Sequence, residues 1–265
     1  MAVQPSQSAK AQLAEEGWCV IPDVLTPAAA KDALDHLWAL HESNVRDGAY
    51  RVVPGLDPNE QNVRVYNLIQ GDPLFRQLIQ NETALEAVRA VLGEKFIISN
   101  FTANIARPGS GSMALHSDQS LVAPEPWLQP WSVNIIWCLT DAYFENGATM
   151  FIPGSHAWKS HAEVPPDASK QLRAFEAKAG SIVVMEGRVW HTSGANITKD
   201  QDRALLFGYY SAAFLRPQTN WALTLPPEIW PELSPQMLTW LGLEALGNRA
   251  FSRGFILPPQ PTETQ

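Results

Sequence analysis

The segment FIISNFTANI, residues 96–105, marks the point where the chain changes from helical to extended character. Large apolar and β-branched side chains dominate this segment, and the sequence Arg107-Pro108-Gly109 follows directly. A run of this composition that stops at a proline–glycine turn predicts a β-strand.

Four further segments after this strand have the same character: 131–139, 148–152, 181–185 and 203–210. Glycine-containing turns separate them, and little helical periodicity lies between them. Such a series predicts a mainly β protein with flanking helices, built as an antiparallel double-sheet barrel of the jelly-roll or cupin type.

Helical signals precede the strands. Thr26-Pro27 provides an N-cap followed by proline at the first helical position, and apolar residues then recur at helical spacing. A second helix is predicted over 82–92, with Gly93 as its stop. Ser234-Pro235 predicts a third, short helix that Gly247 would end.

The chain length and composition favour one domain. With 265 residues, 45% of them hydrophobic, the chain can bury a substantial core. No internal repeat or long low-complexity linker divides it. We therefore predict a single domain over 1–265, with a helical N-terminal part at about 8–93, a barrel core at about 96–216, and a lid or interface segment at about 217–265.

The net charge and the cysteines narrow the class of protein. A formal charge of −8 argues against binding nucleic acid or an anionic membrane surface. The N-terminus lacks the apolar core of a signal peptide, and no stretch reaches the length of a membrane-spanning helix. Cys19 and Cys138 are far apart, so buried free thiols are preferred to a disulfide. We expect a cytoplasmic protein and leave a monomer and a homodimer open.

The residues with the clearest chemical meaning are His116-Ser117-Asp118, followed by His191 and Arg203. Two imidazoles and one carboxylate can occupy one face of an octahedral Fe(II) and leave three positions open. If His116 and Asp118 lie on an extended strand, their side chains leave the same face and can chelate one ion. Arg203 offers a guanidinium fork for the carboxylate of a 2-oxo acid.

The surroundings of these residues resemble a known family. The order is HSD at 116–118, ENGAT at 145–149, IPGSH at 152–156, HTS at 191–193 and then Arg203. This order resembles the phytanoyl-CoA dioxygenase (PhyH) family of Fe(II)- and 2-oxoglutarate-dependent oxygenases. The resemblance runs from about Gly17 to Phe214, and the segment from Asn146 to His156 is more diagnostic than the metal ligands.

The resemblance implies a double-stranded β-helix and a set of site residues. His116, Asp118 and His191 would hold the iron, Arg203 would bind the distal carboxylate of 2-oxoglutarate, and the Thr149 hydroxyl would assist. Dioxygen would be the other cosubstrate, with ascorbate added in vitro. The spacing between His191 and Arg203 is most similar to a branch that oxidises terpenoids and alkaloids.

Some cosubstrate contacts stay open at this point. Certain members of that branch carry a glutamine three residues before the first ligand, where this chain has Met113. Asn104 or Asn134 could supply the contact instead. Ser193 could touch the cosubstrate or be a passive turn residue. Arg64 resembles an upstream basic residue that contacts the cosubstrate in some relatives, although an exposed strand arginine would look the same.

Several residues compete for these roles. Arg188 is an alternative carboxylate anchor, but it lies in a turn where a solvated charge is expected, so Arg203 is favoured. Glu186 could replace Asp118 as a ligand, although its spacing does not support this. His156 and His161 could bind metal, and for His156 the resemblance implies a turn-shaping role instead.

Proline- and tryptophan-rich segments are candidates for the substrate pocket. The loop 121–127 follows the first ligands and could form a pocket wall, and the segment 219–235 could form a lid or a subunit contact. Such a lining favours an apolar substrate, and the scarcity of Lys and Arg there weighs against a coenzyme A thioester.

We therefore predict a dioxygenase that hydroxylates, desaturates or rearranges an apolar natural product. The resemblance also bears on the type of oxidation. Related halogenases lack the carboxylate at this position, so the presence of Asp118 favours hydroxylation, desaturation or ring chemistry. The alternatives are a phytanoyl-CoA-like acyl hydroxylase, a non-redox Zn(II) enzyme on the same barrel, and a silent ligand-binding barrel.

Overall fold

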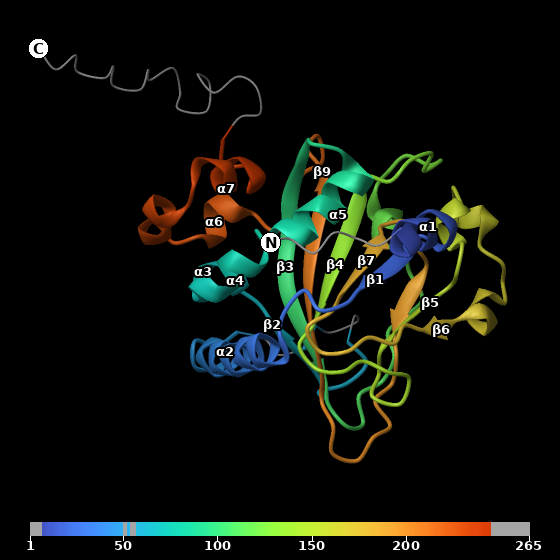
Figure 1. Ribbon diagram of the computed structural model, residues 1–265, viewed down its shortest axis with the longest axis horizontal. Helices are drawn as coiled ribbons and strands as arrows, with labels where there is room; N and C mark the ends of the chain where they lie inside the picture. The colour runs from blue at the N-terminus through green and yellow to red at the C-terminus, as the bar shows by residue number, and fades with distance from the viewer. Residues whose placement is uncertain (1–6, 50–51, 54–56, 245–265) are drawn as a thin grey trace, which may run out of the picture.

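The fold is built on a large antiparallel sheet. The computed structural model describes residues 7–49, 52–53 and 57–244. In this part of the chain six strands form one twisted sheet (Figure 1). Their order is β1 (Trp18–Ile21), β7 (Ile182–Glu186), β4 (Ser132–Cys138), β9 (Arg203–Ala212), β3 (Phe96–Ala106) and β2 (Asn62–Val65).

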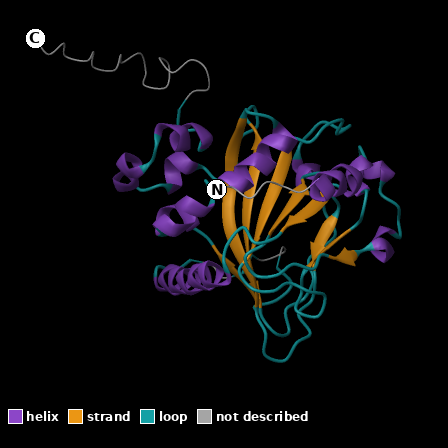
Figure 2. Ribbon diagram, in the orientation of Figure 1, coloured by secondary structure: helices purple, strands orange, loops and turns teal. Residues whose placement is uncertain are grey.

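A second, smaller sheet faces the large one. It contains β6 (Arg173–Ala174), β5 (Thr149–Phe151) and β8 (His191–Ser193), and all strand pairs in both sheets are antiparallel. Figure 2 shows the two sets of strands with helices gathered to the sides. The predicted mainly β, double-sheet fold is confirmed.

Helices cover the outer face of the large sheet. They are α1 (Gln7–Glu16), α2 (Pro27–Arg46), α3 (Leu68–Gly71), α4 (Pro73–Leu78), α5 (Glu82–Leu92), α6 (Trp221–Thr224) and α7 (Pro235–Trp240). The predicted starts are correct, since the Thr26 Oγ1 atom accepts a hydrogen bond of 3.1 Å from the Ala29 amide at the start of α2. The helix predicted over 82–92 is α5, and Gly93 follows it with a φ of 75°.

Alternation along the central strands divides the core into two layers. Ile135 on β4 and Val184 on β7 pack with the helices in the larger apolar cluster. Their neighbours Ile136 and Val183 point the other way, toward the small sheet. Because both faces of these strands are covered, their sequences are almost continuously apolar instead of alternating.

Two expectations need correction. The N-terminal part predicted as helical also contributes β1 and β2, the two edge strands of the large sheet. Each has only four residues and gains its stability from pairing with β7 or β3, which local sequence does not reveal. The helix opened by Ser234-Pro235 ends at Trp240, well before the predicted stop at Gly247, which lies outside the described residues.

Both cysteines are buried free thiols, as predicted, and burial raises the pKa of each to about 12. Among the described residues, no helix has the length and apolar character needed to cross a membrane.

Candidate metal and cosubstrate site

His116, Asp118 and His191 meet at one end of the space between the sheets. One potential ligand atom from each residue lies within 4.8 Å of the others. The Asp118 Oδ1 atom is 4.0 Å from His116 Nε2 and 3.8 Å from His191 Nε2. The two imidazole rings are tilted by 51°, with centroids 4.4 Å apart.

Backbone pairing brings the two histidines together. His191 opens β8, and an isolated antiparallel bridge joins it to His116. The His116 amide donates to the His191 carbonyl at 3.0 Å, and the reverse bond is 2.7 Å. Two residues far apart in the sequence are therefore fixed as direct neighbours before any side-chain contact forms.

Hydrogen bonds orient both rings for ligation. The Nδ1 atom of His116 lies 2.9 Å from the Ala114 carbonyl, and that of His191 lies 3.0 Å from the Val189 carbonyl. A carbonyl only accepts, so each Nδ1 carries the proton and each Nε2 presents its lone pair to the shared space. In metal-binding histidines the ring nitrogen that does not face the metal usually donates a hydrogen bond in this way.

The backbone at Asp118 differs from the extended strand considered for His116 and Asp118. Ser117 is extended, but Asp118 already begins a short 3-10 helix, η1 (Asp118–Leu121), so the strand expected around the HSD sequence is wrong. The carboxylate still turns toward the histidines. Its Oδ2 atom accepts a hydrogen bond of 3.2 Å from Asn134 Nδ2 on β4, which leaves Oδ1 facing the imidazoles.

The protonation state of His191 suits a metal ligand. Burial, and next the neighbouring His116, lower its pKa to about 4 against the opposing effect of Asp118. The ring is neutral at ordinary pH, as ligation requires. Two imidazoles and one carboxylate, with space beside them, fit the donor set of a non-haem Fe(II) centre.

Arg203, the first residue of β9, is buried near this group. Its Nε atom donates to the Gly147 carbonyl at 2.9 Å, and its Nη1 atom donates to the Asn104 carbonyl and side-chain oxygen at 3.2 Å each. All three acceptors are neutral, and within the described ranges Arg203 makes no ion pair. Burial lowers its pKa to about 10, so the guanidinium still carries its charge. A desolvated cation without an acid fits a site that receives an anion.

The ENGAT motif supports this arginine. Gly147 has a φ of 84°, and a Cβ atom there would lie 3.0 Å from the Gly194 carbonyl oxygen. A residue with a side chain would therefore be strained at this position, and the carbonyl that accepts from Arg203 would shift. Asn146 shapes the same turn by donating to the Asp141 carbonyl at 2.8 Å and accepting from the Tyr143 amide at 2.9 Å.

A cavity of about 410 Å³ connects the candidate ligands with the buried arginine. All seven residues predicted for the site line it: His116, Asp118, His191, Arg203, Thr149, Ser193 and Arg64. Thr149 and Ser193 are opposite each other on β5 and β8.

The two weaker candidates are engaged with the protein. Arg64 makes an ion pair with the buried Asp57 at 2.8 Å, and its Nη2 atom is 3.5 Å from the Met113 sulfur. The Ser193 Oγ atom accepts from the Met113 amide at 3.0 Å. These contacts leave their roles toward a cosubstrate as predictions.

The competing residues lie elsewhere. Arg188 and Glu186 pair with each other, and neither lines the site cavity. His161 contacts Glu125 in a surface loop. His156 packs against Gly17, where a Cβ atom would lie 2.8 Å from its ring. None of the four belongs to the metal-compatible group.

Sequence reasoning missed part of the lining, although a signal was present. Asn100 and Thr102 were not singled out, whereas Asn104 was already considered for the cosubstrate contact; the three alternate along β3 and line the cavity. Polar residues at every second position of an apolar strand indicate one polar face. Asn104 carries an additional clue, because its Nδ2 atom is buried and has no hydrogen-bond partner among the described residues. The loop expected as a wall contributes Leu121, whereas Trp127 is buried in a separate cluster.

Comparison with known proteins agrees with this geometry. The profile of the phytanoyl-CoA dioxygenase (PhyH) family matches residues 13–204. Dioxygenase af480 of Aspergillus fumigatus is 52% identical over 241 residues, which are 91% of this chain and 78% of that protein. The multifunctional dioxygenase ausE of Emericella nidulans is 28% identical over 206 residues, 71% of this chain and 68% of that protein.

Solved structures with the same fold include an enzyme of nogalamycin biosynthesis and a protein that holds nickel and 2-oxoglutarate. The non-haem α-ketoglutarate-dependent carbocyclase SnoK from nogalamycin biosynthesis superposes with a TM-score of 0.66 at 23% identity, covering 89% of this chain and 94% of that one. HygX from Streptomyces hygroscopicus, with nickel and 2-oxoglutarate bound, has a TM-score of 0.64 at 18% identity, covering 80% and 89%. At these identities the likeness shows a shared fold.

Proposed function

The chain belongs to the phytanoyl-CoA dioxygenase family, and on that premise we propose that it oxidises an apolar natural product with Fe(II), 2-oxoglutarate and dioxygen. The observation that carries this proposal is the common cavity. It joins a two-histidine, one-carboxylate group to a buried arginine that lacks an acidic partner in the described structure.

His116, Asp118 and His191 would hold the iron. Bound there with its two cosubstrates, the metal supplies oxidation of an unactivated C–H bond while 2-oxoglutarate is consumed to succinate and carbon dioxide. The chain places the groups for this chemistry. Carbonyl bonds to both Nδ1 atoms fix the rings, and Asn134 fixes the carboxylate.

The distal carboxylate of 2-oxoglutarate would bind to Arg203. Charge-assisted bonds to a guanidinium are strong, and the apolar surroundings of this one strengthen them further. Thr149 and Asn104, which line the same cavity, would assist. The Nδ2 atom of Asn104 is a buried donor without a partner in the described part of the chain, so Asn104 is our choice to replace the contact missing at Met113.

The carboxylate of Asp118 bears on the type of oxidation. It points toward both histidines and would occupy a coordination position. This favours hydroxylation, desaturation or ring rearrangement over halogenation, which needs that position for a halide.

The substrate class follows from the cavity and from the relatives. Among the described residues two cations line the site cavity: Arg64 is paired with Asp57, and Arg203 would be occupied by the carboxylate of 2-oxoglutarate. Neither is free to meet the phosphates of coenzyme A, which weighs against the acyl-CoA alternative. The similar proteins include fungal dioxygenases and an enzyme of nogalamycin biosynthesis, which supports a natural product as the substrate; a terpenoid or alkaloid is the type that the sequence resemblance implies.

The proposed function requires an apolar small molecule as the binding partner, namely the substrate. The charge of −8 supports the proposal that nucleic acid is not a partner. The two buried free thiols favour the cytoplasm. A monomer and a homodimer are both compatible with the proposed function.

The test is succinate formation from 2-oxoglutarate by protein reconstituted with Fe(II) and ascorbate, compared with Zn(II)-loaded protein. We expect the Fe(II)-loaded protein to form succinate and the Zn(II)-loaded protein to form none, because only Fe(II) activates dioxygen. A silent barrel or a hydrolytic Zn(II) enzyme yields no succinate under either condition, and that result would overturn the proposal.

A further inference from the structure

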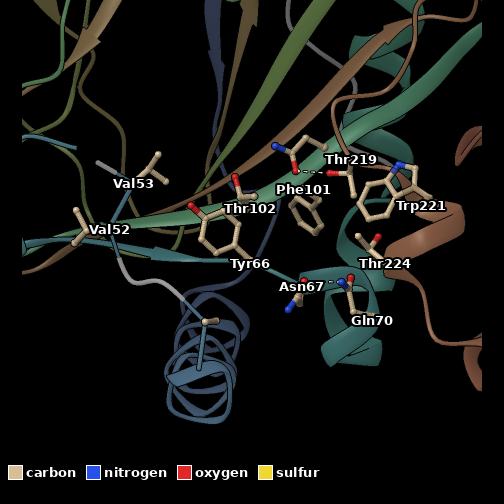
Figure 3. A pocket seen from close by; sticks show the side chains of 12 residues that line it. Val52, Val53, Tyr66, Asn67, Gln70, Phe101, Thr102, Thr219, Trp221 and Thr224 are labelled. Atoms are coloured by element: carbon tan, nitrogen blue, oxygen red, sulfur yellow. Dashed lines mark hydrogen bonds between the residues drawn. The ribbon is translucent and has the colours of Figure 1, made fainter. Parts of the chain in front are cut away.

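A second cavity, of about 440 Å³, lies next to the site. It opens between β3, the segment 66–70 and α6, and we call it the annex (Figure 3). The side chains that define it are Val53, Tyr66, Gln70, Phe101, Trp221 and Thr224.

The annex exists because β2 is shorter than β3. β2 ends at Val65, opposite Ala103, so the first half of β3 has no strand beside it on that edge of the described sheet. The C-terminal segment covers part of this edge, where Trp221 Nε1 donates to the Ile98 carbonyl at 2.8 Å. The space between this segment and the chain leaving β2 remains open.

Two side chains connect the annex with the site cavity. Asn100 and Thr102 line both spaces. Asn100 is held from the side, because its Nδ2 atom donates to Gln218 Oε1 at 3.3 Å and its Oδ1 atom accepts from Thr219 Oγ1 at 3.1 Å. The two cavities are therefore bounded at this point by small polar side chains, and not by a packed apolar core.

The lining of the annex defines the chemistry of its ligand. None of the described residues that line it is charged, and the rings of Phe101, Trp221 and Tyr66 face it (Figure 3). At the end near α3, Gln70 donates to the Asn67 side chain at 2.7 Å. The Gln70 Oε1 atom is buried and has no hydrogen-bond partner among the described residues. An unpaired buried acceptor is costly, and a ligand hydroxyl would satisfy it.

We propose that the annex holds the body of the substrate, an apolar skeleton that carries a hydrogen-bond donor at its far end. The reacting part of the same molecule passes between Asn100 and Thr102 into the site cavity. The volume agrees with a ring-containing ligand, because small-molecule pockets usually measure about 300–1,000 Å³. This inference rests on the proposed function and names the place and the polarity of its substrate.

The test uses 1-adamantanol, a neutral cage alcohol with one hydroxyl, titrated by calorimetry into protein loaded with Fe(II) and 2-oxoglutarate without oxygen. Wild-type protein should bind it. Thr224→Trp, which fills the annex from an exposed position on α6, should weaken binding by roughly tenfold or more. Leu223→Trp is the matched control on the same helix, where Leu223 is 81% exposed and outside the annex lining, so its affinity should equal that of wild type.

Two further variants guard against a folding artefact. Val53→Phe fills the annex from a different segment and should weaken binding in the same way, while thermal unfolding checks that each variant is folded. Gln70→Leu should lower affinity for 1-adamantanol and leave that for 1-methoxyadamantane, which cannot donate, unchanged.

The outcomes separate this inference from the proposed function. Absence of 1-adamantanol binding by wild type, or equal affinity in folded Thr224→Trp and Val53→Phe, would overturn the annex as a ligand site. Saturating 1-adamantanol should also change the rate at which wild type forms succinate under air, and an unchanged rate would overturn the connection to the site. Succinate formation by wild type without the alcohol tests the proposed function alone.

Discussion

Replacement of Arg203 gives the sharpest test of the cosubstrate site. In Arg203→Met the buried guanidinium is lost, together with its bonds to Gly147 and Asn104. Removing one partner of a buried charge pair costs about 3–5 kcal/mol. The dissociation constant of 2-oxoglutarate should therefore rise by roughly 10²–10⁴-fold. Arg203→Lys keeps the charge but not the fork, so a loss of about 1.5–3 kcal/mol is expected from one charged hydrogen bond.

Ligand-dependent stability measures this loss without turnover. At a 2-oxoglutarate concentration of about 100 times the wild-type dissociation constant, binding adds about 2.7 kcal/mol to the free energy of unfolding. A variant bound 100-fold more weakly gains only about 0.4 kcal/mol under the same condition. The assay is therefore chemical unfolding of metal-loaded, oxygen-free protein with and without the diacid.

Arg188→Met is the matched control, since Arg188 pairs with Glu186 outside the cavity. The ligand-free fold of Arg203→Met should persist, because the loss of three hydrogen bonds is offset by the removal of a buried, unpaired cation. If Arg203→Met retains full stabilisation by 2-oxoglutarate while Arg188→Met loses it, the anchor is Arg188 and the reasoning from burial fails.

His116→Ala and Asp118→Ala should each abolish succinate formation while circular dichroism stays that of the wild type, and normal turnover in either would remove that residue from the metal group. Asn134→Leu frees the Asp118 carboxylate, so kcat should fall by roughly 10–100-fold, as for other outer contacts of metal ligands, with little change in KM for 2-oxoglutarate. Cys19 and Cys138, whose pKa values burial raises to about 12, should resist a disulfide-exchange reagent at pH 8 in native protein and react fully after unfolding. Fast labelling of the native chain would contradict the buried placement of the thiols.

The longest strands could be predicted from sequence because each carries its own apolar signal. β3, β4, β7 and β9 form the middle of the large sheet and are covered on both faces, so their composition alone identifies them. β1 and β2 have four residues each and become strands through their partners. Pairing between distant segments is a tertiary effect that local propensity does not encode.

The candidate site also has a part that could be predicted from sequence and a part that could not. The ordered set His116, Asp118, His191 and Arg203 could be selected from residue types and spacing, and the structure brings these side chains to one cavity. The contacts that orient the two imidazoles could not be selected, because the acceptors are backbone carbonyls, whose positions depend on the fold. The annex was also hidden, since its walls come from several separate segments.

Unequal sheet lengths explain why the site cavity and the annex adjoin each other. β3 and β9 have 11 and 10 residues, whereas β5 and β8 in the facing sheet have three each. The small sheet therefore covers only part of the inner face of the large one, and the metal-compatible group sits where β8 begins. Beyond that cover, the inner face of β3 carries Asn100, Thr102 and Asn104 in place of core residues. Polar side chains on an otherwise apolar strand need hydrogen-bond partners from the protein, from water or from a ligand. In our proposal the substrate follows this uncovered face from the site cavity past Asn100 and Thr102 into the annex, so the length of that face would limit how far the substrate extends from the metal-compatible group.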